Sequence, residues 1–296
     1  MIKPVLFTSQ RPLNRCENIK TVYDAFDGPK EFRQMDWWRR HPDIPHYHLM
    51  VTDEIPVMRG EKIIFIPHGI EGTKTYGLDQ PRRYATPEQC QLINYAVGQS
   101  APTVGLMAAQ LGLPEERVLP LGMPRTDNYI RKKDHDKTMY FYAPTFGCDE
   151  PVDWSLVDSM LHDDEILIVK SHMLAGKILD REYHHIFEAS NEEPSASYLM
   201  SCNVLITNYS SIMLDGLCAR IPTILFSKNK NYLETRGMYY EYPDKYSSYF
   251  ADDEFRLIEM ARNATWLDEE KRSFFCGACD GHSTERVIKL IREMNE

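Results

Sequence analysis

NVLITNYSSIMLDGLCARIPTILF, residues 203–226, holds two short apolar runs with a polar turn and a helical segment between them. The runs Val204–Thr207 and Thr223–Phe226 are too short for helices and are rich in β-branched residues, which predicts parallel strands buried on both faces. A strand, a tight turn, a helix and a second parallel strand are the repeating unit of α/β proteins. The stretch therefore predicts an α/β fold.

The turn at residues 208–211 is placed to bind an anion. It follows the carboxyl end of a parallel strand and leads into a helix N-terminus, where free N–H groups and the helix dipole favour phosphate. Ser210 and Ser211 add two hydroxyl donors without adding charge, and Asp215 lies about one turn further along. The alternative interpretation is a helix cap alone, because serine is preferred at N-caps in general.

Length and composition exclude several classes of protein. The 296 residues suffice for two domains of about 150 residues each. A net charge of −10 argues against a nucleic-acid-binding protein, which would present a basic face. No apolar run is long enough to predict a membrane span, and the start MIKPVLFTSQ lacks the pattern of a signal peptide. Seven scattered cysteines indicate reduced thiols. These features together predict a cytoplasmic protein.

The N-terminal half repeats the pattern of strand and polar loop. Residues 5–8 predict a first strand, and residues 18–26 have the apolar spacing of a helix. The loop between them lacks the Gly-x-Gly-x-x-Gly sequence of dehydrogenase-type dinucleotide sites. Residues 62–67 predict a buried strand that ends at His68. A histidine at this edge of a parallel sheet suits a general base, because its ordinary pKa lies near neutral pH; the alternative is a histidine with only a hydrogen-bonding role.

The second half repeats this arrangement after a charged segment. Residues 131–137, RKKDHDK, show no apolar period and predict a linker between domains 1–133 and 138–296. Residues 166–170 predict a buried strand, and His172 follows it closely, as His68 follows the strand in the first half. The sequence therefore predicts two successive α/β domains, each with a histidine at the end of a strand.

Two motifs of the second half resemble the CDP-glycerol glycerophosphotransferase family, which builds teichoic acids and related capsules. They are TNYSSIMLD at residues 207–215 and YLETRGMYYEY at residues 232–242. The family carries Thr-Asp-Tyr-Ser-Ser-x-x-x-Asp and an Arg-Gly-aromatic stretch at these places. Asn208 replaces the family's Asp, and this change removes a negative charge near the expected diphosphate.

Further segments resemble the family and follow its order along the chain. The family's catalytic His and its diphosphate-binding His correspond to His68 and His172, although Pro67 replaces a Trp and Met173 replaces a Pro. Lys74 aligns with a family Lys if one residue is inserted. Three short segments complete the series: GMPRTD at 122–127, APT at 143–145 and DGHSTER at 280–286.

The resemblance implies a glycosyltransferase-B architecture, in which two Rossmann-like domains have parallel sheets facing a central cleft. An acceptor hydroxyl would attack the phosphorus that bears the glycerol of CDP-glycerol, and CMP would leave. Arg125 has an alternative role in an ion pair with Asp127, and Arg11 has an alternative as a solvated loop residue. The implied site comprises catalytic His68 and His172, donor-binding Thr145, Ser210, Ser211, Asp215, Arg125 and Ser283, and acceptor-binding Arg11 and Lys74.

No carboxylate cluster has spacing suited to Mg²⁺, so we expect catalysis without a metal or other cofactor. Cys276, Cys279 and His282 form only half of a zinc pattern. The segment EFRQMDWWRRH at 31–41 predicts either contact with the inner face of a membrane, as a peripheral protein, or packing of its tryptophans against its own domain. Expected partners are CDP-glycerol or another CDP-polyol such as CDP-ribitol, and a hydroxyl acceptor, with a lipid-linked glycan as one candidate. The alternatives are a nucleotide-sugar glycosyltransferase or epimerase, and a non-catalytic acceptor-binding module.

Overall fold

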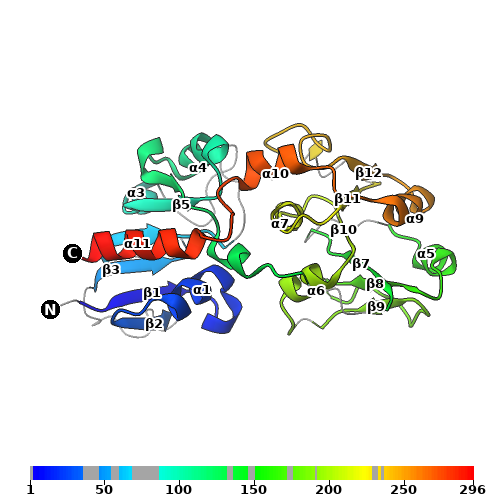
Figure 1. Cartoon of the computed structure of the whole chain (residues 1–296), viewed down its shortest axis with the longest axis horizontal. Helices are drawn as coiled ribbons and strands as arrows, with labels where there is room; N and C mark the ends of the chain where they lie inside the picture. Colours follow the sequence, from blue (N-terminus) through cyan, green and yellow to red (C-terminus); the bar gives the residue numbers. More distant parts are fainter. Residues whose placement is uncertain are drawn as a thin grey trace. The chain divides into compact units, whose positions relative to one another are not determined.

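The chain forms two compact units in a computed structural model (Figure 1). The first contains Met1–Gly72, Tyr76–Asn128 and Phe274–Glu296, and the second contains Thr73–Thr75 and Tyr129–Ser273. The structure describes residues 3–35, 47–54, 60–68, 87–131, 136–145, 151–171, 176–190, 192–228, 233–234 and 237–296.

The first unit is built on a parallel sheet of six strands in the order β2-β1-β3-β4-β5-β6. Its strands are β1 (Val5–Ser9), β2 (Lys30–Gln34), β3 (Tyr47–Thr52), β4 (Gly60–Phe65), β5 (Tyr95–Gly98) and β6 (Val118–Pro120). Its helices are α1 (Glu17–Ala25), α3 (Pro87–Gln91), α4 (Val104–Leu111) and α11 (Ser283–Asn295), with short 3-10 turns that include η4 (Pro124–Asn128). The strands β1, β3 and β4 are neighbours, so the residues that follow them share one edge of the sheet.

The second unit has a parallel sheet of six strands in the order β12-β11-β10-β7-β8-β9. Its strands are β7 (Thr138–Tyr142), β8 (Glu165–Val169), β9 (Ile186–Glu188), β10 (Val204–Thr207), β11 (Thr223–Phe226) and β12 (Tyr249–Ala251). Its helices include α5 (Trp154–Met160), α6 (Ser195–Ser201), α7 (Ile212–Cys218) and α9 (Glu254–Asn263), and α10 (Glu269–Cys276) leads back to the first unit.

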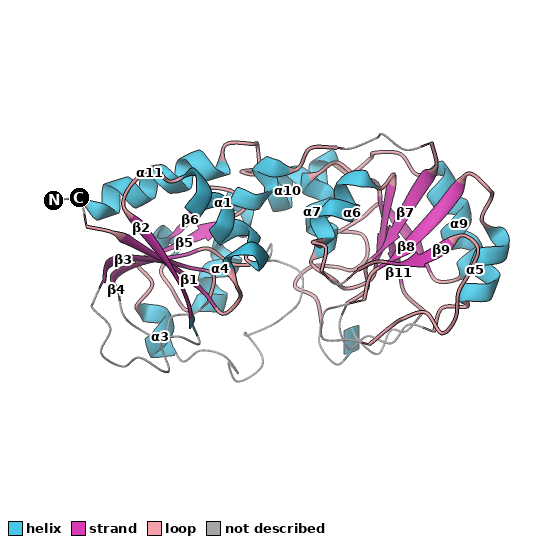
Figure 2. Ribbon diagram, turned by 90° about the horizontal axis from the view of Figure 1, so that it is seen from below, coloured by secondary structure: helices cyan, strands magenta, loops and turns pink. Residues whose placement is uncertain are grey.

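Helices lie on both sides of each sheet (Figure 2), which explains why the central strands are apolar throughout. All four residues of β10 and all four of β11 are buried. Helix α7 approaches these strands closely at Gly216, where a Cβ atom would lie 2.5 Å from Thr223 Oγ1 and 2.9 Å from Leu205 Cδ2. Glycine at this position therefore lets the turn and helix predicted at residues 208–218 lie directly on the sheet.

The division into units differs from the sequence boundaries at the C-terminus, because residues 274–296 pack with the first unit and not with the second. Helix α11 buries Val287, Leu290, Ile291 and Met294, an apolar stripe that packs against α1 and β3. Gly122 has a φ of +84°, and a Cβ atom there would lie 2.2 Å from Ala278 O. Because Gly122 has no side chain, the backbone at Ala278 can pack closely against the turn before η4.

The strands predicted at 5–8, Val204–Thr207 and Thr223–Phe226 are confirmed, the first with one added residue. The segment at 31–41 begins as part of β2, which is paired with β1. Trp37, Trp38 and residues 132–135 of the expected linker lie outside the described residues. The sequence placed the end of the first domain at residue 133, whereas the main segment of the second unit begins at Tyr129 in the structure.

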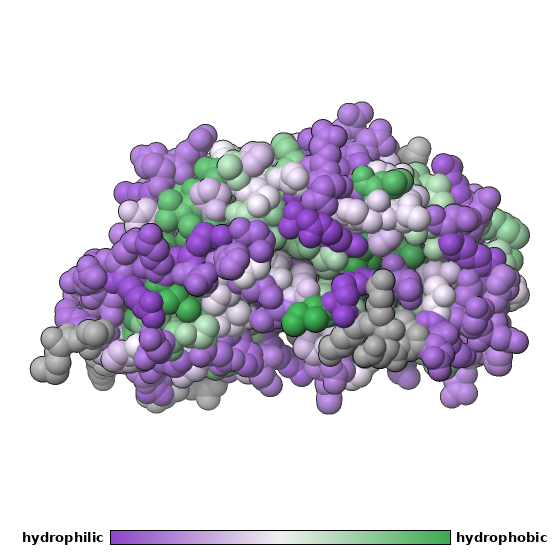
Figure 3. Space-filling view, viewed as in Figure 1, coloured by the Kyte–Doolittle hydropathy of each residue, from purple (hydrophilic) through white to green (hydrophobic). Residues whose placement is uncertain are grey.

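The surface view is mostly hydrophilic (Figure 3), and apolar residues form small separate patches on the face shown. Large apolar side chains that are exposed in the described part of the chain are Ile130, Phe187, Phe255 and Leu267. None of the helices that the structure describes is both long and apolar enough to cross a membrane.

Candidate functional site

In the second unit, the ends of β7 and β10 are tied together by the side chain of Asn208. These strands are neighbours, with Ile206 opposite Tyr142. The Oδ1 atom of Asn208 accepts hydrogen bonds of 2.7 Å from the backbone N–H groups of Thr145 and Tyr209. This carboxamide therefore fixes the two loops that leave the carboxyl edge of the sheet.

Two hydrogen-bonding atoms at this edge have no partner among the described residues. Asn208 is fully buried and Thr145 is 5% exposed. The Asn208 Nδ2 and Thr145 Oγ1 atoms are buried without a hydrogen bond in the structure as described. An unsatisfied buried donor costs about 1–3 kcal/mol, so such groups are rare unless a ligand completes them. An aspartate at position 208 could accept the same two N–H bonds but would offer no N–H group of its own.

The hydroxyls of Ser210 and Ser211 can also form further hydrogen bonds. Ser211 occupies the N-cap position of α7, but its side chain makes no capping hydrogen bond within the described residues. Ser210 Oγ lies 3.5 Å from the N–H nitrogen of Ile212, at the outer limit for a hydrogen bond. Both residues are only partly buried. The interpretation of the serines as helix caps alone is therefore not supported by their geometry.

Asp215 lies on α7 and is 6% exposed. Its Oδ1 atom accepts a hydrogen bond of 2.6 Å from the hydroxyl of Tyr129. The carboxylate is thus held within the second unit, and a contact with a nucleoside hydroxyl remains a prediction. His172 lies outside the described residues; the described chain at the end of β8 stops at Ser171, which is buried.

In the first unit, the edge formed by β1, β3 and β4 carries a carboxylate that the sequence analysis missed. Asp53 directly follows β3 and is 3% exposed. Its Oδ2 atom accepts a 3.1 Å hydrogen bond from Ser9 Oγ, and Ser9 Oγ accepts one of 3.1 Å from the backbone N–H of Arg11. The Oδ1 atom of Asp53 is buried without a hydrogen bond to any described residue.

Burial changes the acidity of this edge. Desolvation raises the pKa of Asp53 from 3.8 to about 6, although the Ser9 hydrogen bond and the charge of Arg11 oppose the change. Desolvation and then the charge of Asp53 raise the pKa of Glu54 from 4.5 to about 7. Carboxylates with a pKa near neutral can exchange protons at physiological pH. The sequence signal was available, because the apolar run at 49–51 is followed by Thr-Asp-Glu.

His68 follows β4 on the same edge. The Arg125 guanidinium donates a hydrogen bond to the backbone oxygen of His68. The buried Asn18 joins both segments, since its Nδ2 atom donates to Pro67 O at 2.8 Å and its Oδ1 atom accepts from Arg125 N at 2.9 Å. His68 has solvent-accessible surface, but protein atoms around the ring still desolvate it. Desolvation and then the charges of Arg11 and Arg125 lower the pKa of His68 from 6.5 to about 4. The imidazole is therefore neutral at pH 7.

The structure gives Asp127 and Ser283 positions that the sequence did not predict. Asp127 accepts hydrogen bonds from the backbone N–H groups of Ser283 and Thr284 at 3.1 and 2.7 Å, so it caps the N-terminus of α11. Ser283 is fully buried in the first unit, and its Oγ atom lies 3.5 Å from Ala278 O. Arg125 lies 4.0 Å from Glu17. The roles of Arg125 and Ser283 as donor ligands remain predictions, and Lys74 lies outside the described residues.

The half zinc pattern near the C-terminus has other contacts. Cys276 and Cys279 are buried, and Cys279 Sγ lies 3.4 Å from the backbone nitrogen of Met123. His282 is exposed and its Nδ1 atom lies 3.1 Å from a carboxylate oxygen of Glu285.

Comparison with known proteins identifies a family and several relatives of this chain. Residues 48–293 match the model of the family described as CDP-Glycerol:Poly(glycerophosphate) glycerophosphotransferase. A teichoic acid glycerol-phosphate transferase of Staphylococcus aureus is 21% identical over 242 residues, which cover 69% of this chain and 61% of that protein. A teichoic acid poly(ribitol-phosphate) polymerase of Bacillus spizizenii is 25% identical over 215 residues, which cover 62% and 35%. The chain thus spans less than two thirds of the length of these relatives.

Solved structures share the fold. The wall teichoic acid polymerase TagF aligns with a TM-score of 0.79 at 19% identity, covering all of this chain and 90% of that one. A UDP-N-acetylglucosamine 2-epimerase candidate from Listeria monocytogenes aligns with a TM-score of 0.61 at 11% identity, covering 99% and 97%. These likenesses and the two parallel six-stranded sheets confirm the predicted fold class, a two-domain glycosyltransferase-B type.

Proposed function

Because this chain belongs to the CDP-glycerol:poly(glycerophosphate) glycerophosphotransferase family, we propose that it transfers a polyol phosphate from a CDP-linked donor to an acceptor hydroxyl and releases CMP. CDP-glycerol is the donor we favour, and a teichoic acid or related surface polymer is the product. CDP-ribitol is the alternative donor, since the relatives include both a glycerol-phosphate transferase and a ribitol-phosphate polymerase.

The observation that carries this proposal is the group of uncharged donors at the end of β7 and β10. Asn208 Nδ2 and Thr145 Oγ1 are buried without a hydrogen bond to any described residue, Ser211 makes no capping bond there, and Ser210 Oγ makes only a long contact of 3.5 Å with Ile212 N. Donors fixed in a buried site stabilise phosphate charge without reorganising during the reaction. We propose that these four residues bind the donor diphosphate, together with His172.

The proposed reaction is a displacement at phosphorus. The acceptor oxygen forms a bond to the phosphorus that carries the polyol, the bond from this phosphorus to the CMP oxygen breaks, and CMP leaves with the electron pair. The acceptor proton passes to a base. His68 is the base we favour, because its imidazole is neutral at pH 7. Positioning and charge stabilisation supply most of the catalysis in such reactions.

Asp53 supports a second assignment for the base. A pKa of about 6 is nearer to neutral pH than the value of about 4 for His68, and general bases are most effective when their pKa lies near the working pH. The pH dependence of turnover separates the two: a loss of turnover below about pH 4 supports His68, and a loss below about pH 6 supports Asp53. The acceptor is proposed to contact Arg11 and Lys74, and a lipid-linked glycan on the inner face of a membrane is one candidate for it.

Calorimetry with CDP-glycerol, CDP-ribitol and a UDP-sugar in the presence of EDTA tests the donor assignment, and release of CMP with a panel of polyol and glycan acceptors tests transfer. We expect a CDP-polyol to bind without a divalent metal and to yield CMP. Binding of the UDP-sugar alone, with release of UDP, would replace this proposal by a nucleotide-sugar enzyme. Donor binding without CMP release on any acceptor would favour a non-catalytic module.

A further inference from the structure

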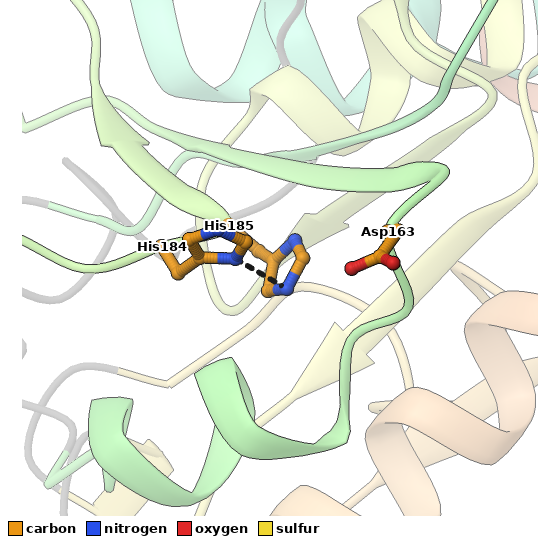
Figure 4. A group of neighbouring side chains, drawn as sticks. All are labelled: Asp163, His184 and His185. Atoms are coloured by element: carbon orange, nitrogen blue, oxygen red, sulfur yellow. Dashed lines mark hydrogen bonds between the residues drawn. The ribbon is translucent and has the colours of Figure 1, made fainter.

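A cluster of metal-ligating side chains lies in the second unit, apart from the residues used above. Asp163, His184 and His185 each offer one ligand atom, and these atoms all lie within 4.8 Å of one another. In Figure 4 the Asp163 carboxylate points toward the imidazole of His185, and His184 lies on the other side of that ring. We propose that these three residues form a binding site for a zinc-like transition-metal dication.

The two histidines already direct ring nitrogens at one point. His184 Nδ1 and His185 Nε2 are 2.8 Å apart and share a hydrogen bond, and the rings meet at 87° with centroids 4.2 Å apart. A metal that replaces the shared proton would hold two imidazole nitrogens at about 2.0–2.1 Å each, which in tetrahedral geometry places them about 3.3–3.4 Å from each other. The required opening is about half an ångström, within reach of small ring rotations.

The main chain that carries these ligands is fixed on both sides. Asp158 accepts hydrogen bonds from the backbone N–H groups of His184 and His185, at 3.2 and 2.7 Å. The His185 carbonyl accepts one of 2.9 Å from Leu167 N in β8, and the turn that contains Asp163 is held by a 2.7 Å bond from Thr138 N to Asp164 O. His185 itself is 8% exposed. The ligands are therefore presented by ordered backbone, which limits the entropy lost on binding.

The ligand set selects the class of ion. Two imidazole nitrogens and one carboxylate oxygen suit Zn²⁺, Cu²⁺, Ni²⁺ or Co²⁺, whereas Mg²⁺ and Ca²⁺ prefer oxygen ligands throughout. Three protein ligands leave one tetrahedral position for water. Asp163 and His184 are exposed, so an ion can enter from solvent.

The site lies at the opposite edge of the sheet from the proposed donor site. Asp163 precedes β8, and His184 and His185 precede β9, so the cluster is at the amino ends of these parallel strands. The residues proposed to bind the donor follow the carboxyl ends of β7 and β10. A strand of five residues is about 15 Å long. The ion would tie the α5–β8 turn to β9 and take no part in transfer.

The test is zinc titration of untagged, EDTA-treated protein by calorimetry, with cobalt absorption as a second reading of coordination geometry. We expect one equivalent of Zn²⁺ to bind, Mg²⁺ not to bind, and bound Co²⁺ to give the intense visible bands of a tetrahedral site. His184→Gln and Asp163→Ala should each weaken zinc binding by at least the roughly 10- to 100-fold seen when a supporting residue of a metal site is lost. Both positions are exposed, so folding should be retained.

His162→Gln is the matched control, because His162 is adjacent to Asp163 but its Nδ1 atom faces Glu165 at 3.9 Å. This variant should bind zinc as the unmodified protein does. Equal losses for His162→Gln and His184→Gln would overturn the ligand set, and a failure to saturate at millimolar zinc would overturn the site. Asp163→Ala should leave CDP-glycerol binding in EDTA unchanged, so the outcome is independent of the proposed transfer reaction.

Discussion

Replacing Asp53 by asparagine should change how the stability of the first unit depends on pH. The pKa of Asp53 is raised from 3.8 to about 6 by desolvation. Because the folded protein holds this proton more tightly than the unfolded chain does, the stabilisation is complete below pH 3.8 and is lost as the pH rises through 6. The difference between the two pKa values corresponds to about 3 kcal/mol of unfolding free energy.

Asparagine has the same shape and no charge, so it removes this pH-dependent term. Its Oδ1 atom can keep the hydrogen bond from Ser9, and its Nδ2 atom takes the place of the carboxylate oxygen that has no partner. Any cost of leaving that nitrogen unsatisfied is the same at every pH. We therefore expect the stability of Asp53→Asn relative to the unmodified protein to be about 2.4 kcal/mol more favourable at pH 8 than at pH 4, where part of the unfolded chain is already ionised.

Urea unfolding at pH 4, 5, 6, 7 and 8 measures this difference. Two compact units can unfold in separate transitions, so the comparison is made on the transition that the substitution moves. The exposed Glu116→Gln provides a control that changes net charge by the same amount. If the stability difference between Asp53→Asn and the unmodified protein is the same at pH 4 and pH 8, Asp53 is not a desolvated carboxylate. If Asp53 also acts on the acceptor, the variant should lose CMP release and keep donor affinity.

Four further variants test the donor site and the base. Ser210 and Ser211 replaced together by alanine should weaken donor binding by roughly 1.5–3 kcal/mol per hydroxyl with unchanged thermal unfolding; an unchanged dissociation constant in calorimetry would remove both serines from the site. Thr145→Val should weaken donor binding by a similar amount while the melting temperature stays constant or rises, because it deletes a buried hydroxyl that makes no hydrogen bond to a described residue; parallel losses of affinity and melting temperature would point to a structural role. His68→Ala should lower turnover by on the order of a hundred- to ten-thousand-fold and leave donor binding intact, whereas His172→Ala should impair both. Normal CMP release by His68→Ala would rule out His68 as the base.

Much of the fold could be predicted because its signals are local. The strands β10 and β11 are short, β-branched and flanked by turn residues, and the structure has them at the predicted residues. Burial on both faces leaves a continuous apolar run, so no knowledge of the partner strands is needed to recognise it.

The position of the last helix depends on contacts that the sequence does not display. The apolar spacing predicts α11 but not which sheet it covers. That choice follows from Gly122, which admits Ala278 at close range, and from Asp127, which caps the helix from 156 residues away. The structure buries Ser283 in the first unit, and its role as a donor ligand stays a prediction.

The candidate sites differ in predictability for the same reason. Ser210 and Ser211 are recognisable from the chain because the turn, the strand and the helix are contiguous. The position of Asp53 after the apolar run at 49–51 is visible in the sequence, but its raised pKa arises from desolvation only after β1, β3 and β4 have assembled. Asn208 Nδ2 and Thr145 Oγ1 make no hydrogen bond to a described residue, and this can be recognised only once β7 and β10 are adjacent.

The two sheet edges differ in charge in a way that supports the proposed division of substrates. The edge at β7 and β10 carries hydroxyl and carboxamide donors, and Asn208 stands where the family's aspartate would add a negative charge. The edge at β1 and β3 carries Asp53 and Glu54, whose ionised forms disfavour a doubly charged diphosphate. A neutral hydroxyl, by contrast, can donate its proton to such a carboxylate. This difference supports our proposal that the nucleotide binds to the second unit and a hydroxyl acceptor to the first.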